Sequence, residues 1–250
     1  THTIQPGSTH GVIAGGANHQ IASQAPYAFI GGGLINQIGA GATNAVIVGG
    51  RLNENAGIRG FIGSGLGNEI TTNGFDSAIL GGATNLLSAR RSVIAGGHSN
   101  QILDNPLATV IGGGSFNVAQ RGIETPNFST IVGGSGNLVS ADYATVLGGL
   151  GNLARARFSV VAGALANVNS NHIAAFVFNS NIANARESVA AVSMTMDFPN
   201  GYYFFTSANN GAQIPPNGTS WSAISDREAK ENFAPVDTGA ILGKVAAMPL

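Results

Sequence analysis

The residue types that carry chemistry are scarce in this chain, and several of them stand together near its C-terminal end. The segment Ser225-Asp226-Arg227-Glu228-Ala229-Lys230 brings a hydroxyl, two carboxylates and an amine within a few residues. Read as local structure, Ser225 followed by Glu228 is a capping box, which satisfies the free N–H groups at the start of a helix. From the local pattern alone, the cap is the stronger explanation of Ser225.

The remaining polar residues predict no catalytic or ligand-binding constellation. The five histidines, at positions 2, 10, 19, 98 and 172, show no metal-ligand spacing. Gly-Gly-Ser-Gly-Asn at 133–137 is similar to a calcium-binding repeat but has Asn at the acidic position, so it lacks the anionic oxygen that calcium prefers. Gly112-Gly113-Gly114 does not lead to Lys-Ser/Thr, so no phosphate loop is present. We expect no cofactor, no metal and no substrate-directed enzyme activity, because the acidic pairs of a glycan hydrolase are also missing from the repeats.

A repeat determines the elements that carry these residues. One copy reads Val93-Ile94-Ala95-Gly96-Gly97-His98-Ser99-Asn100: two apolar residues, a small one, Gly-Gly, two variable residues and Asn. The Asn position recurs at 19 (a His there), 36, 53, 68, 85, 100, 117, 137, 152 and 167, in steps of 17, 17, 15, 17, 15, 17, 20, 15 and 15 residues. A near-constant step of this size is typical of a solenoid.

Each repeat predicts one coil with two short strands and two turns. β-Branched pairs such as Val46-Ile47 precede Gly-Gly, and a second apolar position such as Ile102 follows Asn, with no window long enough for a helix. Gly supplies backbone at positive φ, and Asn is expected in the turn because it tolerates the left-handed region. A coil this thin encloses little core. We therefore expect the remaining apolar face of the solenoid to pack against other copies of the chain, most simply in a homotrimer. A three-sided single-chain β-helix is the alternative.

Composition supports a folded chain with an unusual surface. Charged residues make up 9% of the 250 residues, the net charge is −1, and there are no cysteines. Without a basic stripe, nucleic acid is not expected as a partner, and no apolar run approaches the length of a membrane helix. No charged residue precedes Arg51, whereas the segment from 226 to 244 is rich in charge. This shift predicts a domain boundary near residue 225, followed by a helix that Asp237 or Thr238 caps.

The repeats resemble the head repeats of trimeric autotransporter adhesins, in the variant found in phage tail fibres and related bacterial surface proteins. The resemblance covers residues 12 to about 183, with Phe176–Asn181 as a decayed last repeat. It implies an all-β, left-handed parallel β-roll or β-solenoid, an intertwined homotrimer in which three chains pack about one axis. The expected domains are a β-roll over 1–183, a neck or β-hairpin connector over 184–224, and the truncated start of another domain over 225–250.

The segment from Trp221 to Pro249 is similar to the start of the intramolecular chaperone domain of phage tail spikes such as endosialidases. In that family the domain helps three chains to align and fold, and it then cleaves itself from them with a Ser and a Lys five residues later. The resemblance therefore assigns self-cleavage to Ser225 and Lys230, with Asp226 orienting the pair, in the full-length parent. A neutral Lys can take the Ser proton only when burial or a neighbouring cation lowers its pKa.

The predicted function is a structural and adhesive fibre segment outside the cell: on a virion tail, an extracellular injection-type particle or a bacterial surface. The alternatives are the shaft of an enzyme-bearing tail spike and a single-chain β-solenoid binding protein. The longest connector, 119–129, is a candidate contact loop for a cell-surface glycan or protein receptor, because binding residues of solenoids often lie in connectors. Solvated turns are the plainer interpretation. The loop residues that we single out are Arg121, Glu124, Asn127 and Phe128.

Overall fold

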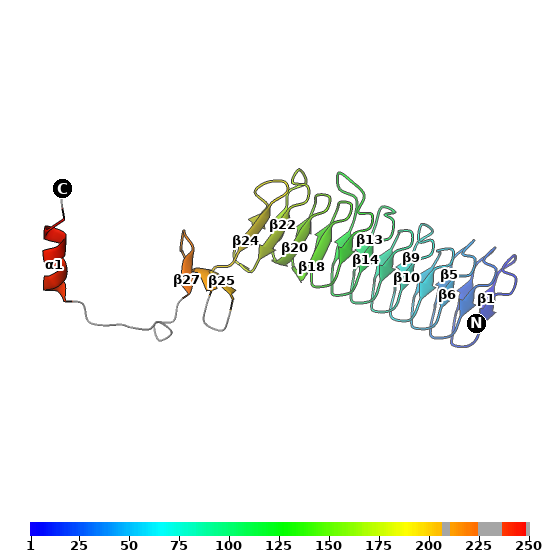
Figure 1. Ribbon diagram of the computed structural model, residues 1–250. Helices are drawn as coiled ribbons and strands as arrows, with labels where there is room; N and C mark the ends of the chain where they lie inside the picture. The colour runs from blue at the N-terminus through cyan, green and yellow to red at the C-terminus, as the bar shows by residue number, and fades with distance from the viewer. Residues whose placement is uncertain (207–210, 225–236, 249–250) are drawn as a thin grey trace. The chain divides into compact units, whose positions relative to one another are not determined.

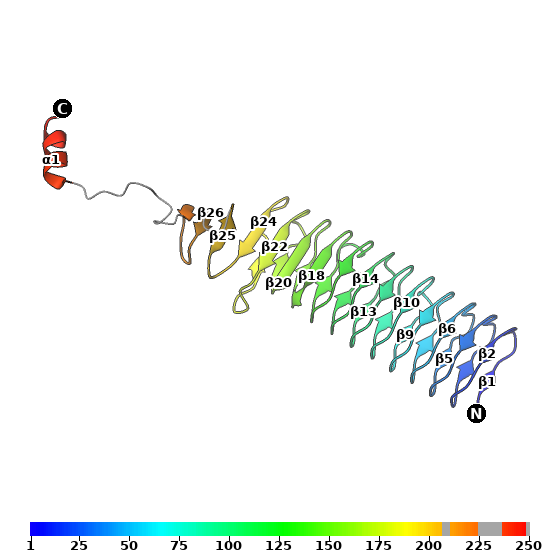
Figure 2. The ribbon, with the colours of Figure 1, turned by 60° about the horizontal axis from the view of Figure 1, so that its bottom comes forward.

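The computed structural model describes residues 1–206, 211–224 and 237–248, and it is almost entirely β (Figure 1). It divides into two units, Thr1–Asp197 and Phe198–Leu250, which are considered separately. Unit 1 is a β-solenoid whose coils stack from the blue end to the yellow end in Figures 1 and 2. The predicted all-β solenoid is confirmed.

Unit 1 contains two parallel sheets of twelve strands each, and a third row of isolated parallel bridges follows the Gly-Gly turns from Ala17 to Leu150. The first sheet contains the odd-numbered strands: β1 (Thr3–Ile4), β3 (Gln20–Ile21), β5 (Gln37–Ile38), β7 (Glu54–Asn55), β9 (Glu69–Ile70), β11 (Leu86–Leu87), β13 (Gln101–Ile102), β15 (Val118–Ala119), β17 (Leu138–Val139), β19 (Leu153–Ala154), β21 (Ala166–Val168) and β23 (Arg186–Glu187). The second contains the even-numbered strands: β2 (Val12–Ile13), β4 (Phe29–Ile30), β6 (Val46–Ile47), β8 (Phe61–Ile62), β10 (Ala78–Ile79), β12 (Val93–Ile94), β14 (Val110–Ile111), β16 (Thr130–Ile131), β18 (Thr145–Leu150), β20 (Val160–Ala164), β22 (Phe176–Asn179) and β24 (Met194–Asp197).

Each sequence repeat forms one coil, and equivalent residues of successive repeats lie side by side. Val46 pairs with Phe61, Phe61 with Ala78 and Ala78 with Val93, so the register follows the sequence repeat. The turn containing Gly-Gly keeps its length, with seven positions from Ile94 of β12 to Gln101 of β13 as in the neighbouring coils. All variation in coil length up to β19 therefore falls in the other connector, between an odd strand and the next even strand.

The core is a double ladder of aliphatic side chains inside a single chain. Each two-residue strand places one residue outward and one inward, and the inward residues of both sheets meet. Fully buried members include Ile30, Ile47 and Ile62 of one sheet and Ile21 and Ile38 of the other. Each such side chain contributes about 1.5–3 kcal/mol on burial. The sequence-based expectation of little internal core is therefore corrected, because isoleucines from the two sheets fill the thin coil completely.

The repeated Asn has a different role from the predicted one. It is the variable residue before Asn that adopts positive φ, as at Ser99 (53°) and Phe116 (55°), whereas Asn100 itself is fully buried. The Asn100 amide donates to the carbonyl oxygens of Gly96 (2.9 Å) and Gly114 (3.0 Å), and its oxygen accepts from the Asn117 N–H (3.1 Å). Asn thus ties each turn to the next coil, and this buried ladder replaces the expected left-handed turn residue.

The second glycine of each pair is required by the approach of the next coil. Gly97 has φ of 91°, and a Cβ at this position would lie 2.1 Å from the Gly114 carbonyl oxygen. The first glycine is less constrained, since a Cβ on Gly96 would meet nothing within 4 Å.

The solenoid continues to Asp197, past the predicted β-roll boundary at residue 183. β22 is a regular rung paired with β20 and β24, and β23 pairs with β21. An ion pair with an Arg186 Nε–Asp197 Oδ2 distance of 2.9 Å joins β23 to the end of β24. Hydrogen bonding between rungs continues here although the Gly-Gly-x-x-Asn pattern is lost, because parallel pairing needs extended backbone and not the motif.

Unit 2 contains a small antiparallel sheet and one helix. The sheet joins β25 (Tyr202–Phe205), β26 (Gly211–Ile214) and β27 (Ser222–Ile224) in that order. Helix α1 spans Thr238–Ala246, and the Asp237 carboxylate accepts from the N–H groups of Gly239 and Ala240, as the capping pattern predicts. The large apolar residues of α1 and of the residues just after it are all exposed: Ile241, Leu242, Val245 and Met248.

Candidate functional site

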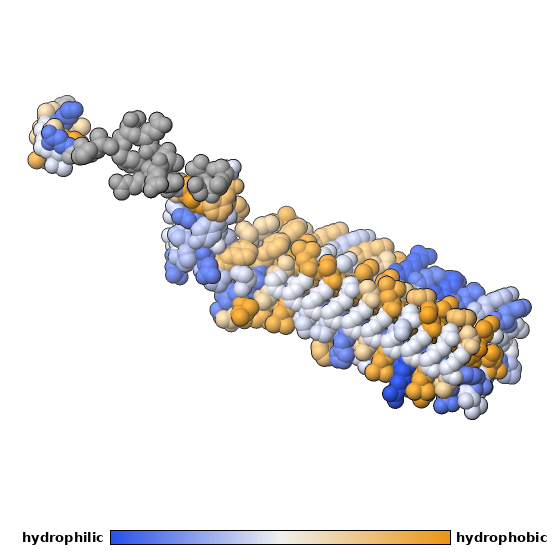
Figure 3. Space-filling view, turned by 90° about the horizontal axis from the view of Figure 1, so that it is seen from below, coloured by the Kyte–Doolittle hydropathy of each residue, from blue (hydrophilic) through white to orange (hydrophobic). Residues whose placement is uncertain are grey.

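The outward side of the even-numbered sheet is apolar along the solenoid, and we call it the apolar face. Its members share an outward position at the start of an even strand or two residues later. The first row is Val12, Phe29, Val46, Phe61, Ala78, Val93, Val110, Thr130, Thr145, Val160 and Phe176; the second is Ala14, Gly31, Val48, Gly63, Leu80, Ala95, Gly112, Val132, Leu147, Ala162 and Phe178. None of these residues is charged. Figure 3 shows hydrophobic residues running along much of unit 1 beside bands of near-neutral ones.

In most coils a larger side chain in one row accompanies a smaller one in the other, and the exceptions are Val46 with Val48 and Phe176 with Phe178. Gly31 follows Phe29, and a Cβ there would lie 3.3 Å from the Phe29 ring and closer still to a carbonyl of the next coil. In β10 the order is reversed, with Ala78 in the first row and Leu80, which is 51% exposed, in the second. An exposed apolar surface that continues over many coils is suited to packing against another apolar surface.

The outward side of the odd-numbered sheet is more polar. Glu54 and Glu69 stand on neighbouring rungs in direct register. Desolvation raises the pKa of Glu69, and the adjacent Glu54 charge raises it further. Like charges placed opposite each other destabilise a sheet. The two outer sides of the solenoid therefore differ in chemistry, and the two outward rows of the even-numbered sheet carry no charge from β2 to β22.

A second feature is a row of residues at the corner that precedes each even strand, and we call it the corner ladder. Its members all have positive φ, and each after the first donates its N–H to a carbonyl of the preceding coil. They are His10, Tyr27, Asn44, Arg59, Asp76, Arg91, Ala108, Phe128, Tyr143, Phe158, Ala174 and Val192. Because the row advances one residue per coil, neighbouring side chains are held at the spacing of the rungs, about 4.8 Å.

Chemically matched neighbours on the corner ladder interact. Tyr143 stacks on Phe128 at a centroid distance of 5.3 Å and on Phe158 at 5.1 Å. Arg59 forms a two-point ion pair with Asp76, with an Nη2–Oδ2 distance of 2.9 Å. Hydrogen bonds from Arg59 lower the pKa of the Asp76 carboxyl, and the positive charges of Arg59 and Arg91 act in the same direction.

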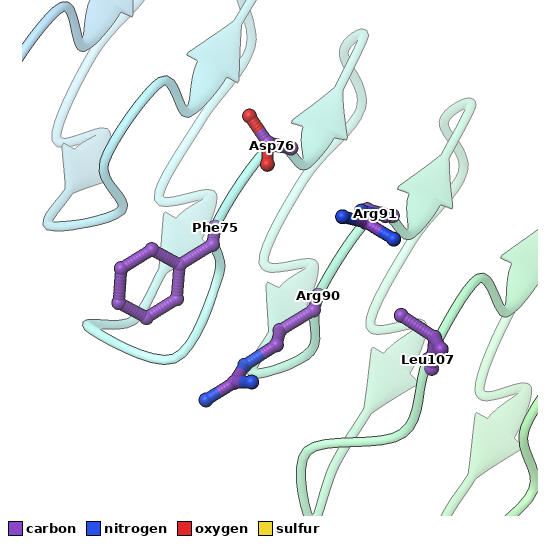
Figure 4. A pocket seen from close by; sticks show the side chains of 5 residues that line it. All are labelled: Phe75, Asp76, Arg90, Arg91 and Leu107. Atoms are coloured by element: carbon purple, nitrogen blue, oxygen red, sulfur yellow. The ribbon is translucent and has the colours of Figure 1, made fainter.

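A cavity of about 440 Å³ opens beside the corner ladder, and we call it the notch (Figure 4). Phe75, Asp76, Arg90, Arg91 and Leu107, from three successive coils, line it. The Arg90 guanidinium lies over the Phe75 ring, 5.5 Å from its centroid. In Figure 4 the Phe75 and Arg90 side chains extend to the same side of the chain. The notch therefore combines cationic groups, one carboxylate and two apolar side chains.

The four residues predicted as a contact loop do not form one cluster. Asn127 acts within the solenoid: its amide donates to Asp142 Oδ1 (2.9 Å), and its oxygen accepts from the Leu107 N–H (2.9 Å). Phe128 belongs to the aromatic stack. Glu124 lies 3.5 Å from Arg157, and the Arg121 N–H donates to Asp104 Oδ2. All four residues remain predictions as receptor contacts, and Glu124, Asn127 and Phe128 also have the partners within the solenoid named above.

The predicted self-cleavage residues Ser225, Asp226 and Lys230 lie outside the described residues. Within the described ranges, His, Asp and Glu side chains form no group of three that could hold a metal ion. None of the helix residues in those ranges belongs to a segment with the length and apolarity of a membrane span.

The sequence interpretation missed the notch, although a signal for it exists in the alternation of 15- and 17-residue steps around Arg90 and Arg91. It also missed the corner ladder, because its members share a backbone conformation and not a residue type. No protein-family model and no curated protein gives a significant match to this chain.

Proposed function

We propose that this chain is a segment of a trimeric extracellular fibre, in which three solenoids pack through their apolar faces and present their other surfaces to a receptor. The observation that carries the proposal is the uncharged apolar face over eleven coils. Its outward residues include Val48, Leu80, Val132 and Leu147, each about half exposed. Contiguous exposed apolar surface of this extent marks an interaction site in soluble proteins.

Further copies of the same chain are the occupants that fit this face best. The face repeats once per rung, and a parallel copy repeats with the same period, so residues of equal size can meet along the whole length. Apolar contact between copies also suits a face without a single ionisable group, since nothing on it needs a charged partner. The number three rests on the resemblance to autotransporter head repeats.

The resemblance at the C-terminal end extends the proposal to self-release. In the full-length parent, the Ser225 hydroxyl would attack an adjoining peptide carbonyl as Lys230 takes its proton, and the peptide C–N bond would break as its nitrogen takes a proton back from Lys230. Water would then hydrolyse the resulting ester, and the chaperone would separate from the assembled fibre.

Native mass spectrometry tests the assembly. The unsubstituted chain should give a trimer. A Leu80→Lys/Val132→Lys variant should give monomers, because each lysine would be buried in the trimer without a counter-charge. A Gln37→Lys/Gln101→Lys variant on the odd-numbered sheet is the matched control and should stay trimeric. A monomeric parent would contradict the proposal and favour a single-chain binding solenoid.

Self-release is tested separately on the complete gene product. We expect shortened chains in the parent and intact chains in Ser225→Ala. Shortened chains in both would assign the cleavage to another residue or to a protease.

A further inference from the structure

The notch is a consequence of coil length. Eight positions separate Ile70 of β9 from Ala78 of β10, and eight separate Ile102 of β13 from Val110 of β14. Between these two connectors, only six positions separate Leu87 of β11 from Val93 of β12. A short connector thus lies between two longer ones, and its exposed Arg90 and Arg91 line the notch.

The corner ladder shows what an arginine in this geometry binds. A short connector also carries Arg59, with six positions from Asn55 of β7 to Phe61 of β8. One coil further along the ladder from Arg59 is Asp76, whose carboxylate takes the two-point ion pair. One coil further along from Arg91 is Ala108, which offers only a methyl group. The second short connector thus has the arginine but not its carboxylate.

The charges around the notch are unbalanced. Within the described part of the chain, no carboxylate oxygen lies within 4.0 Å of Arg90 or Arg91. Asp76 is engaged by Arg59, so Arg91 shares a carboxylate that already has a closer partner. Arginine binds carboxylates through two parallel hydrogen bonds, with more specificity than a lysine would give.

We infer that the notch binds a carboxylate-bearing sugar, such as a uronic acid unit of an acidic glycan, whose carboxylate occupies the place left empty at Ala108. Three properties of the lining favour a sugar acid over a simple anion or an acidic peptide. Phe75 and Leu107 offer apolar surface to the C–H face of a sugar ring. Asp76 offers an acceptor for sugar hydroxyls, whereas it would repel a second peptide carboxylate. The cavity, about 440 Å³, is at the small end of ligand pockets.

This inference names the ligand class for the receptor-binding part of the proposed function, and it rests on that part alone and not on the trimer. Binding in the notch uses residues of one chain, so it does not require the trimer. The mass measurement reports on assembly and a binding measurement reports on the notch, so either proposal can fail while the other stands.

Saturation-transfer difference NMR on the full 250-residue chain tests the inference with four probes: glucuronate, glucose, acetate and triglutamate. Glucuronate should bind at low ionic strength, at least about tenfold more tightly than glucose or acetate, since charge-assisted bonds and ring packing act together. Arg91→Gln should lose most of this binding. Ala108→Asp should lose it too, because the new carboxylate would take the position of the ligand.

Ala174→Asp is the matched control. Ala174 is another alanine of the corner ladder with positive φ and partial burial, and it lies away from the notch. This variant should bind glucuronate as the parent does, and circular dichroism should show all three variants folded. Equal binding of acetate and glucuronate would reduce the notch to an anion site and overturn the sugar assignment. Tighter binding of triglutamate, undiminished binding by Ala108→Asp, or no binding of glucuronate would each overturn it as well.

Discussion

Replacing one asparagine of the buried ladder tests how the coils are held together. In Asn100→Ala, the Asn117 N–H loses its partner inside the solenoid, and the carbonyls of Gly96 and Gly114 each lose a donor. An unsatisfied buried N–H costs about 1–3 kcal/mol, and each lost hydrogen bond to a carbonyl costs about 0.5–1.5 kcal/mol. The expected loss of unfolding free energy is therefore about 2–6 kcal/mol.

The assay is urea denaturation followed by circular dichroism, with hydrogen exchange to locate the effect. Because a solenoid coil contacts only its neighbours, amide protection should fall first in the coils on either side of Asn100. Asn44→Ala is the control: this asparagine is exposed, and its side chain has no hydrogen bond within the described residues. It should cost less than about 1 kcal/mol, most of it from positive φ at alanine. If Asn100→Ala costs no more than Asn44→Ala, the hydrogen bonds of the ladder do not stabilise the fold.

Two further predictions concern pH. Burial, with a smaller contribution from His2, lowers the pKa of His19, which stands at the Asn position of its coil. The folded form therefore loses stability as pH falls below the ordinary histidine pKa, and His19→Asn should remove this acid sensitivity in melting curves at pH 8 and pH 5. An unchanged pH dependence in that variant would contradict the assignment. Because the pKa of Glu69 is raised, its charge costs stability as pH rises above the ordinary Glu value; Glu69→Gln should gain about 0.2–1 kcal/mol at pH 7 and nothing at pH 3. A gain that persists at pH 3 would assign it to packing and not to charge.

The repeat alone predicted the position of the strands, because an apolar pair and a fixed turn recur wherever a rung begins. The role of Asn was not predictable from it. Ile35, Leu52, Ser99 and Phe116 all adopt positive φ before the ladder Asn, so residue type gives no indication of which turn residue carries that conformation. Contacts with the next coil, and not local residue preference, determine the conformation of the turn. A carbonyl of the next coil accepts from the amide of Asn, and the backbone of that coil packs against the second Gly.

The expectation of a thin core failed for a related reason. Counting apolar residues in one coil underestimates burial, since each inward isoleucine is also covered by those of the coils above and below. Asn55 stands among them and is fully buried, yet its amide donates to the Val46 carbonyl and its oxygen accepts from the Gly57 N–H. A polar residue is thus accommodated in the ladder when the adjoining turns supply its partners.

The apolar face and the notch both follow from a difference between the two connectors of each coil, one constant in length and the other variable. The Gly-Gly turn has constant length because the asparagine ladder and the close approach of glycine to the next carbonyl allow no insertion. The opposite connector carries neither constraint, so it varies from six positions at Leu87–Val93 to eleven at Ala119–Thr130 without disturbing the rungs. A short connector between longer ones leaves a recess, and the corner ladder decides whether the arginine in it is paired, as at Arg59, or open, as at Arg91. The rigid turn thus keeps the rungs of the apolar face in register, while the variable connectors provide sites that can differ from coil to coil.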